Sequence, residues 1–366
     1  MMETIVRVAR GEGLGSVAVR AGERLSEAWQ RRMRILRGAA RPMPHPRLLN
    51  VLPVPPSSRL GGVVVQLNAR LAEERRLRDV ALFDQRWLQS GARAWRTTSL
   101  EAIGARTLIV EGAFRDPWTI PEDGAELILA IHDFSLISSH PHELEVDEAR
   151  RKRAVQLLER ARAAIFPSAF LRDAYRAIVP RFEARLIEPG IAGGFLRLAP
   201  IGNRIAFAGS VKPHKGGALI PEIIRATGAA EWHVFGGGDL ELLRPVRGRA
   251  AIHGYYRAGS LSRLLVRNRI GLAILPSIVP ESFSLTLSEC WSAGVPVVAF
   301  DHGAIAERIR AHGGGFLVPR EAGAEGIAAC VRDWLNGAAT MVSLHVPSAH
   351  DAAAAHVALY EELGVL

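Results

Sequence analysis

Two carboxylates, Glu281 and Glu289, bracket seven uncharged residues within the stretch PESFSLTLSECWSAGVPVVAF. A packed core does not accommodate either charge unless the charge has a partner. The stretch predicts a loop that carries Glu281, a helix that begins near Ser282 to Ser284 and holds Glu289, and then an apolar strand. The positive end of the helix would attract an anion, and the carboxylates would accept hydroxyl groups. A ligand with a diphosphate and sugars fits both features. The alternative is that Glu281 caps the helix while Glu289 is solvated on its surface.

A second candidate for ligand chemistry is the turn FAGSVKPHKGG, which holds Lys212, His214, Lys215 and three glycines. A glycine turn that leads into a helix exposes backbone amides suited to phosphate, and a lysine adds positive charge. The spacing is not that of a P-loop. An ordinary strand-to-helix turn with solvated lysines is therefore the alternative. The nearby VFGGGDLELL lacks the G-x-G-x-x-G spacing and is interpreted as a tight turn.

The elements that position these residues follow from an alternation of apolar runs and amphipathic stretches. Short apolar strands alternate with helical segments first from residue 47 to about 190, and again after Gly194. This pattern favours parallel sheets covered by helices on both faces. It predicts an α/β protein with two doubly wound, Rossmann-like domains that face each other across a cleft. The predicted parts are a basic segment (1–45), an N-terminal domain (46–195), a C-terminal domain (196–345) and a C-terminal helix (346–366).

Polar residues lie where the predicted strands end, which is where doubly wound sheets bind ligands. Gly61 and Gly62 follow the first strand of the first half, and His132 and Asp133 follow its fourth. In the second half, Ser210, Lys212 and Lys215 follow the first strand and Glu281 follows the fourth.

The N-terminal segment holds most of the excess positive charge. Residues 1–47 contain ten arginines and four glutamates, a balance of +6 within the chain's net +9. Apolar residues from Leu14 to Leu36 recur every three or four positions and predict a helix with one apolar stripe. Either the helix packs on the main body, or it lies on an anionic membrane surface. A nucleic-acid partner is not expected, because aromatic residues are not interleaved with the arginines.

Composition sets outer limits on these interpretations. The chain is 48% hydrophobic and 23% charged, which is typical of globular proteins. Two cysteines are too few for a disulfide framework, and no apolar run is long enough to span a membrane. We expect a cytoplasmic protein, with the basic segment as the possible contact to the inner face of the membrane. His132, His140 and His142 lack accompanying cysteines, so no metal site is expected.

The stretch PESFSLTLSECWSAGVPVVAFDHGAIAE is similar to the E-x7-E segment of the family-four retaining glycosyltransferases, which have the GT-B fold. Other pieces follow in the same order. FAGSVKPHKGG resembles the phosphate-binding turn of the family, AAIHGYY resembles the strand beside the base, and RLLNVLPVPPSSRLGGVVVQLNARLA resembles the opening strand and glycine loop. HDFSLISSHPHELE resembles segments of bacterial polysaccharide-assembly enzymes.

This resemblance implies a role for each matching residue. Glu289 would bind ribose hydroxyls, Glu281 would hold the donor sugar beside the amides of residues 283–285, and Lys215 would neutralise the diphosphate. Gly62 would let the backbone approach the donor phosphates, and His132 would lie near the transferred sugar and acceptor. The candidate catalytic residues are His132, Lys215 and Glu281. The candidate nucleotide-sugar-binding residues are Gly62, Ser210, Lys212, Lys215, Tyr255, Ser282, Phe283, Ser284, Leu285 and Glu289.

The expected function is metal-independent, retaining transfer of a sugar from a nucleotide diphosphate sugar to a hydroxyl of a glycan or lipid-linked acceptor, in cell-surface polysaccharide biosynthesis. No cofactor is expected beyond that donor substrate. Ser210 stands where the family usually has an arginine, and Ser284 stands where glycine is common. These departures keep a second function open, a nucleotide-sugar-binding scaffold subunit with weak or no catalysis.

Overall fold

The computed structural model describes residues 44–52, 62–77, 80–83, 87–90, 93–96, 100–112, 120, 124–191, 204–257, 259–338 and 346–366. The predicted N-terminal helix and residues 53–61 lie outside this part of the chain. The described residues form two compact units: one contains 44–191 and 347–366, and the other contains 204–346 apart from the gaps given above. The C-terminal helix therefore belongs to the unit that holds the first sheet.

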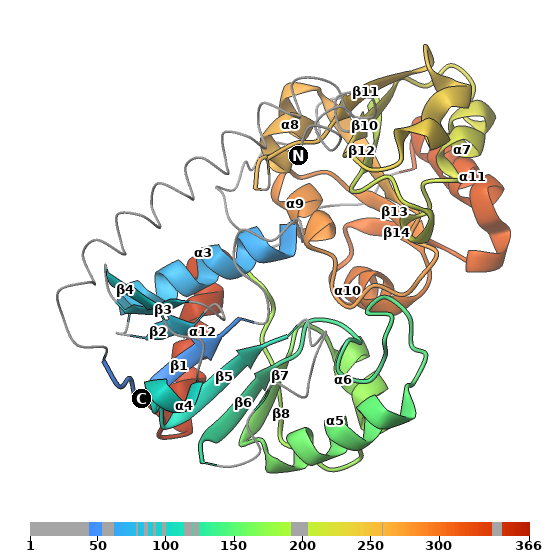
Figure 1. Ribbon diagram of the computed structural model, residues 1–366. Helices are drawn as coiled ribbons and strands as arrows, with labels where there is room; N and C mark the ends of the chain where they lie inside the picture. The colour runs from blue at the N-terminus through green and yellow to red at the C-terminus, as the bar shows by residue number, and fades with distance from the viewer. Residues whose placement is uncertain are drawn as a thin grey trace. The chain divides into compact units, whose positions relative to one another are not determined.

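The first unit contains a sheet in the order β4-β3-β2-β1-β5-β6-β7-β8 (Figure 1). Its strands are β1 (Leu48–Val51), β2 (Ala81–Phe83), β3 (Trp87–Ser90), β4 (Arg93–Arg96), β5 (Thr107–Glu111), β6 (Glu126–Ala130), β7 (Ala163–Phe166) and β8 (Ala184–Leu186). Its helices are α3 (Gly62–Leu77), α4 (Leu100–Ile103), α5 (Glu148–Arg160), α6 (Ala169–Arg176) and α12 (Ala349–Glu362). The six parallel strands are the six apolar runs predicted from the sequence.

The antiparallel strands β3 and β4 were not predicted. Leu88 of β3 pairs with Phe83 of β2 and with Trp95 of β4, so a hairpin extends the parallel sheet at one edge. An antiparallel strand at the edge of an otherwise parallel sheet is common in doubly wound folds, and it leaves the order of the parallel strands unchanged.

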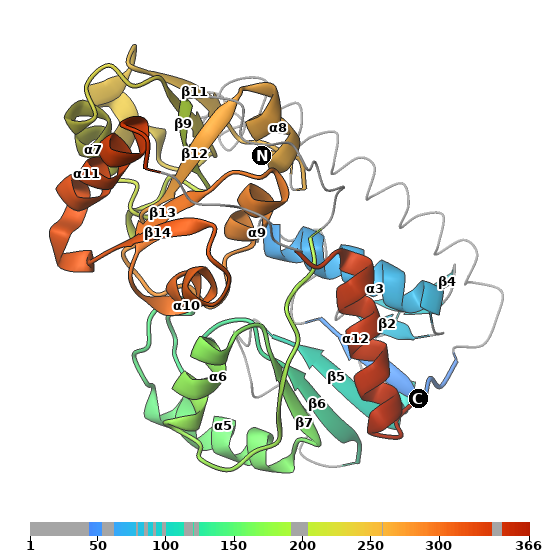
Figure 2. The same ribbon diagram turned by 180° about the vertical axis from the view of Figure 1, so that it is seen from behind.

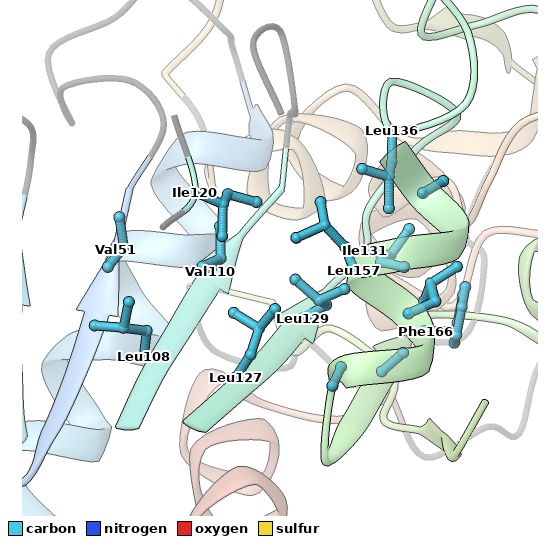
Figure 3. Close-up of a cluster of buried hydrophobic side chains, with 14 of the residues drawn as sticks. Val51, Leu108, Val110, Ile120, Leu127, Leu129, Ile131, Leu136, Leu157 and Phe166 are labelled. Atoms are coloured by element: carbon cyan, nitrogen blue, oxygen red, sulfur yellow. The ribbon is translucent and has the colours of Figure 1, made fainter. Parts of the chain in front are cut away.

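Side chains of the first sheet alternate between two apolar layers, as the period of two in a strand requires. Val51, Leu108 and Val110 point into one core (Figure 3), and Leu49 and buried residues of α5 and α6 belong to the same core. The intervening residues, such as Leu48 and Ile109, pack instead with Leu359 and Tyr360 of α12. Helix α12 lies beside α3, as Figure 2 shows. The sheet is thus covered on both faces, which explains why its strands are continuous apolar runs.

The second unit contains a parallel sheet in the order β11-β10-β9-β12-β13-β14. Its strands are β9 (Arg204–Ala208), β10 (Trp232–Phe235), β11 (Ala250–Gly254), β12 (Ile270–Leu275), β13 (Val297–Phe300) and β14 (Gly315–Val318). Its helices are η2 (Pro213–Lys215), α7 (Ile220–Ala226), η3 (Leu240–Val246), α8 (Leu261–Arg267), α9 (Leu285–Ser292), α10 (Gly303–His312), η4 (Arg320–Ala322) and α11 (Gly323–Leu335). This order is that of the Rossmann fold, with its reversal between β9 and β12.

One face of the second sheet packs on α7 and α11 through Phe207, Val234, Ile223 and Ile327, which are all buried. Helices α9 and α10 connect β12 to β13 and β13 to β14, and they lie on the opposite face of the sheet from α7 and α11 (Figure 1). The prediction of two doubly wound α/β domains is confirmed for each unit. Their arrangement across a cleft stays a prediction.

Candidate functional site

The turn after β9 is built differently from the predicted phosphate loop. Helix η2 is a single turn, and its backbone amides are already used: Lys215 N–H donates to Lys212 O at 3.1 Å, and Gly217 N–H donates to the same oxygen at 2.9 Å. The prediction that the glycines present free amides to phosphate is therefore wrong for these positions. Ser210 and Lys212 are exposed on the turn. The side chains of Lys212 and Lys215 offer positive charge to an anion at this turn.

Lys215 and Glu281 meet although they are far apart in sequence. The ammonium Nζ of Lys215 lies 2.9 Å from Oε2 of Glu281, with side-chain exposures of 30% and 14%. Both residues lie beyond the carboxyl ends of adjacent strands, β9 and β12, where the strand order of this sheet reverses. Ligands of doubly wound sheets bind at this kind of position.

Backbone contacts fix the two loops that carry this ion pair. Ser277 Oγ and Ile278 N–H both donate to His214 O, at 3.2 and 3.1 Å. Gly216 has φ of 75°, and a Cβ there would lie 1.9 Å from Pro276 O. Only glycine allows this close approach, so the loop after β12 sits directly on the turn after β9.

The loop between Glu281 and α9 contains a strained residue. Ser284 has φ of 72°, in the left-handed region, and its Oγ caps α9 by accepting from Leu287 N–H at 3.4 Å. The helix is thus capped by Ser284 and not by Glu281, which excludes the capping alternative for Glu281. Ser282 is half-buried before this residue, and Leu285 begins the helix.

Arg308 of α10 binds the backbone of the same loop. Its guanidinium donates to Phe283 O and Ser284 O, both at 3.2 Å, and to Ser288 Oγ at 2.9 Å. It also lies 3.9 Å from the centroid of the Phe283 ring. These contacts fix the backbone of the three residues whose amides were predicted to bind the donor.

Glu289 lies within α9 and is 7% exposed. Burial raises its pKa to about 7, although backbone N–H groups of Leu261 and Gly259 act in the opposite direction. Its Oε1 atom is buried and has no hydrogen-bond partner among the described residues. The alternative of a solvated Glu289 is therefore wrong. A buried carboxylate oxygen without a donor is costly, and a ligand hydroxyl would offset that cost.

One of the two tyrosines after β11 lies near this carboxylate. Tyr256 interacts electrostatically with Glu289, and burial is the main cause that raises the pKa of its phenol well above the usual range. Tyr255, the predicted nucleotide-binding residue, precedes it and is half-buried.

The remaining predicted residues belong to the first unit. Gly62 is the first residue of α3. His132 follows β6, as predicted, and its Nε2 lies 3.2 Å from Oε2 of Glu111 at the end of β5. Asp133 accepts from Ser135 N–H at 2.9 Å and shapes the turn that follows.

Two contributors were not identified from the sequence. Arg308 lies in a helix of mixed composition, and nothing in AERIRAH indicates that its side chain reaches a loop about 25 residues earlier. Glu111 did leave a signal, a charge at the end of the apolar run TLIVE. Among the described residues, no group of three or more histidine, cysteine or acidic side chains is arranged to hold a metal ion. None of the described helices is both long and apolar enough to cross a membrane.

Comparison with protein families gives a match within the second unit. Residues 202–337 match the family described as Glycosyl transferases group 1. Sequence comparison with curated proteins gives no match.

Solved structures show the same fold over most of the chain. A sucrose-phosphate synthase from Thermosynechococcus elongatus matches with a TM-score of 0.62 and 14% identity, over 87% of this chain and 99% of that one. HepE from Anabaena, in complex with UDP and glucose, gives 0.61 and 16%, over 88% and 100%. AviGT4, a glycosyltransferase involved in avilamycin A biosynthesis, gives 0.56 and 17%, over 87% and 98%. The fold is therefore the GT-B fold of glycosyltransferases, as predicted.

Proposed function

We propose that the protein is a retaining, metal-independent glycosyltransferase that moves a sugar from a nucleotide diphosphate sugar to a hydroxyl of a glycan or lipid-linked acceptor in cell-surface polysaccharide biosynthesis. The observation that carries the proposal is the buried Oε1 of Glu289, which has no partner among the described residues. It lies in the domain that matches Glycosyl transferases group 1. A ribose hydroxyl is the donor that this oxygen would accept.

In the proposed reaction, the bond from the anomeric carbon to the diphosphate oxygen breaks, and a bond to the acceptor oxygen forms on the same face of the sugar. The acceptor proton passes to the departing diphosphate. Lys215 neutralises that leaving group, and Glu281 holds sugar hydroxyls, so that the ion pair of these side chains is shared with the bound donor. The protein supplies positioning and electrostatic stabilisation. His132 is assigned to the transferred sugar and acceptor.

The donor base is testable directly. HepE was solved with UDP-glucose, which makes uridine nucleotides the first choice for this chain. We expect calorimetry to detect binding of UDP or of another nucleoside diphosphate, and mass spectrometry to detect sugar transfer to an acceptor mixture. Binding of none of UDP, GDP and TDP would contradict the proposed function.

A scaffold subunit that binds a nucleotide sugar without strong catalysis is the second candidate. Ser210 is the observation that favours it, because it places a short neutral side chain where the resembling enzymes usually have an arginine. Lys212 is exposed on the same turn and could supply the missing charge. Nucleotide binding without transfer to any acceptor tested would support the scaffold.

The basic N-terminal segment supports a peripheral membrane location. Its charge would hold the protein on an anionic leaflet, and salt would weaken that attraction because charges are screened beyond about 10 Å at 0.1 M. We expect deletion of residues 1–44 to leave nucleotide binding intact and to abolish sedimentation with vesicles that contain phosphatidylglycerol. Unchanged sedimentation of the truncated protein would contradict the membrane role. An unstable truncated protein would instead support a helix packed on the fold.

A further inference from the structure

A buried group of charged side chains lies behind His132 in the first unit. Four elements contribute to it: Asn50 of β1, Arg70 and Glu74 of α3, Glu111 of β5, and His356 and Tyr360 of α12. The carboxylates of Glu74 and Glu111 are completely buried. A doubly wound sheet needs no charge at this depth for packing, and burying ions is costly unless each is paired.

Each charge in the group has a defined partner. Arg70 donates to Glu74 Oε1 at 2.6 Å and to Oε1 of Glu111 through its other terminal nitrogen. Glu74 accepts at Oε2 from Asn50 Nδ2 at 3.2 Å. The second oxygen of Glu111 faces His132 Nε2 at 3.2 Å. His132 is the one member of this chain of contacts that leaves the interior, because 24% of its side chain is exposed.

The charge of Glu111 decides which partner donates in the hydrogen bond between Glu111 and His132. Burial alone would raise the pKa of Glu111, but Arg70 and the contact with His132 outweigh it and lower this pKa to about 2. Burial raises the pKa of Glu74 to about 7, with Arg70 opposing. Glu111 is thus the carboxylate that balances Arg70 at neutral pH. An ionised carboxylate can only accept, so Nε2 of His132 must be the donor.

Helix α12 places two polar side chains, His356 and Tyr360, beside the carboxylate of Glu111. Burial lowers the pKa of His356 to about 3, so its ring is neutral, and its Nδ1 donates to Ala352 O at 2.7 Å. Tyr360 faces Arg70, Glu74 and Glu111 from the same helix. Asp133, next to His132 in the chain, is turned toward Ser135.

We propose that Glu111, held by Arg70, is a positioning residue for His132 that fixes the imidazole as the Nε2–H tautomer and leaves Nδ1 as the nitrogen available to a substrate hydroxyl. This inference rests on the proposed function for its catalytic consequence, but the tautomer itself does not. Because Nε2 donates to Glu111, the imidazole ring cannot turn freely. The lone pair on Nδ1 therefore points in one fixed direction. A hydroxyl of the bound sugar or acceptor would donate to Nδ1, as in other sites where a carboxylate orients a histidine.

The tautomer can be read in the unaltered protein. Long-range proton–nitrogen NMR on histidine-labelled full-length protein, at a pH where the ring is neutral, shows which ring nitrogen carries the proton. The signal of His132 is assigned by its loss in His132→Gln. We expect the proton on Nε2. A proton on Nδ1 would overturn the proposal.

A pair of variants separates positioning from packing. In Glu111→Gln, the amide can donate to Nε2 and favour the wrong tautomer, while Glu74 can still balance Arg70, so we expect a folded protein. We expect kcat to fall about ten- to one-hundred-fold, the loss of one hydrogen bond to a charged group, with UDP affinity unchanged. The matched control is Glu74→Gln, because Glu74 also contacts Arg70 but does not contact His132. It should keep the Nε2–H tautomer and lose less than about three-fold in kcat.

The outcomes separate this inference from the proposed function. Equal loss of kcat in both variants, with the tautomer retained in both, would mean that the group acts only through stability, and would overturn the positioning role. Nε2–H in the unaltered protein and Nδ1–H in Glu111→Gln would support that role even if no sugar transfer is found, in which case the proposed catalysis alone fails.

Discussion

The ammonium of Lys215 lies 2.9 Å from the carboxylate of Glu281, although the two residues follow different strands. The backbone of the loop after β12 is fixed to His214 and Gly216, and this holds Glu281 beside Lys215. In the proposed function, a pair fixed in this way at the reversal of strand order has two uses for a nucleotide sugar. The cation can face the diphosphate while the carboxylate faces the sugar, and neither side chain has to be ordered on binding.

Removing the cation should affect turnover more than binding. In Lys215→Ala the departing diphosphate loses its point charge, and Glu281 is left without its partner. We expect kcat to fall about 100-fold or more, as for the loss of one group that stabilises developing charge. Affinity for UDP should fall less, by about ten-fold or less. Steady-state kinetics and calorimetry measure the two effects.

Lys215→Arg and Lys212→Ala complete this comparison. The arginine variant keeps the charge and should retain more kcat than the alanine variant. Loss of turnover in Lys212→Ala would show that this exposed lysine supplies the positive charge that Ser210 lacks. Full turnover in Lys215→Ala would remove Lys215 from the catalytic residues.

Most of the parallel strands were predictable because they are apolar runs that are buried on both faces, so their period and length are visible without knowing their neighbours. The edge strands β8, β11 and β14 are partly exposed. The hairpin of β3 and β4 was not predictable. Its strands are four residues each, with Trp87 and Trp95 among charged and polar residues. Such a pattern becomes a strand through pairing with β2, and pairing of this kind is a tertiary property.

The residues of the candidate site likewise differ in whether they could be predicted from the sequence. Glu281 and Glu289 were identified because a carboxylate beside an apolar strand is costly and therefore conspicuous in sequence. Arg308 was not identified, because its importance lies in the loop carbonyls that it contacts. Glu111 also stands at the end of an apolar run, but nothing in the sequence indicates its contact with a histidine ring. No local pattern encodes which distant group a long side chain will reach.

The strained residue beside the carboxylates gives a stability test. Ser284 has φ of 72°, a conformation that costs a non-glycine residue about 1–2 kcal/mol. We expect Ser284→Gly to stabilise the protein by up to about 1 kcal/mol, because replacing a serine cap by glycine costs only a few tenths of that. Thermal unfolding measures it. A lower melting temperature for the variant would show that the Oγ cap outweighs the strain.

The opposite effect is expected from Arg308→Leu. It removes the donor to Phe283 O, Ser284 O and Ser288 Oγ, and we expect a loss of about 2–4 kcal/mol from a buried charged donor. The loss should shrink when Ser284→Gly is added, because the loop then needs less restraint. Strict additivity in the double variant would contradict coupling of the two residues.

The approach of two loops at Gly216 can be tested against a matched glycine. Gly216 and Gly228 both have positive φ, 75° and 67°, but a Cβ at Gly216 meets Pro276 O at 1.9 Å and one at Gly228 meets nothing within 4 Å. Gly228→Ala should cost about 1 kcal/mol from backbone strain alone. Gly216→Ala should cost about 3 kcal/mol or more, because the backbone of Pro276 must move. Equal melting temperatures would contradict the close approach.

Glu289 should make stability depend on pH. Its pKa rises from the ordinary 4.5 to about 7 on folding, so the folded state holds the proton more tightly. The associated stability is present below about pH 4.5 and is lost as pH rises through about 7. The shift corresponds to about 3 kcal/mol in the free energy of unfolding. Glu289→Gln should therefore gain stability relative to the parent protein at about pH 8 and little at about pH 5.

The control for that comparison is Glu222→Gln, which changes an exposed carboxylate on α7 to an amide. It should leave the pH profile of chemical denaturation unchanged. A profile for Glu289→Gln that parallels the parent protein would show that Glu289 is already ionised in the folded state.

The same proton should control donor affinity. The ionised carboxylate of Glu289 accepts hydroxyl protons at both oxygens, whereas the protonated form has lost one acceptor. Affinity for a nucleotide sugar should therefore rise as pH increases through about 7. UDP-glucose is the better probe than UDP, because its phosphates are both diesters and do not titrate in this range. Glu289→Ala should bind UDP-glucose about ten-fold or more weakly at about pH 8. The variant should also lose the pH dependence, which calorimetry in buffers from about pH 6 to about pH 8 would measure. Equal affinity of parent and variant at every pH would show that ribose is not held by Glu289, and the observation that carries the proposed function would then have another cause.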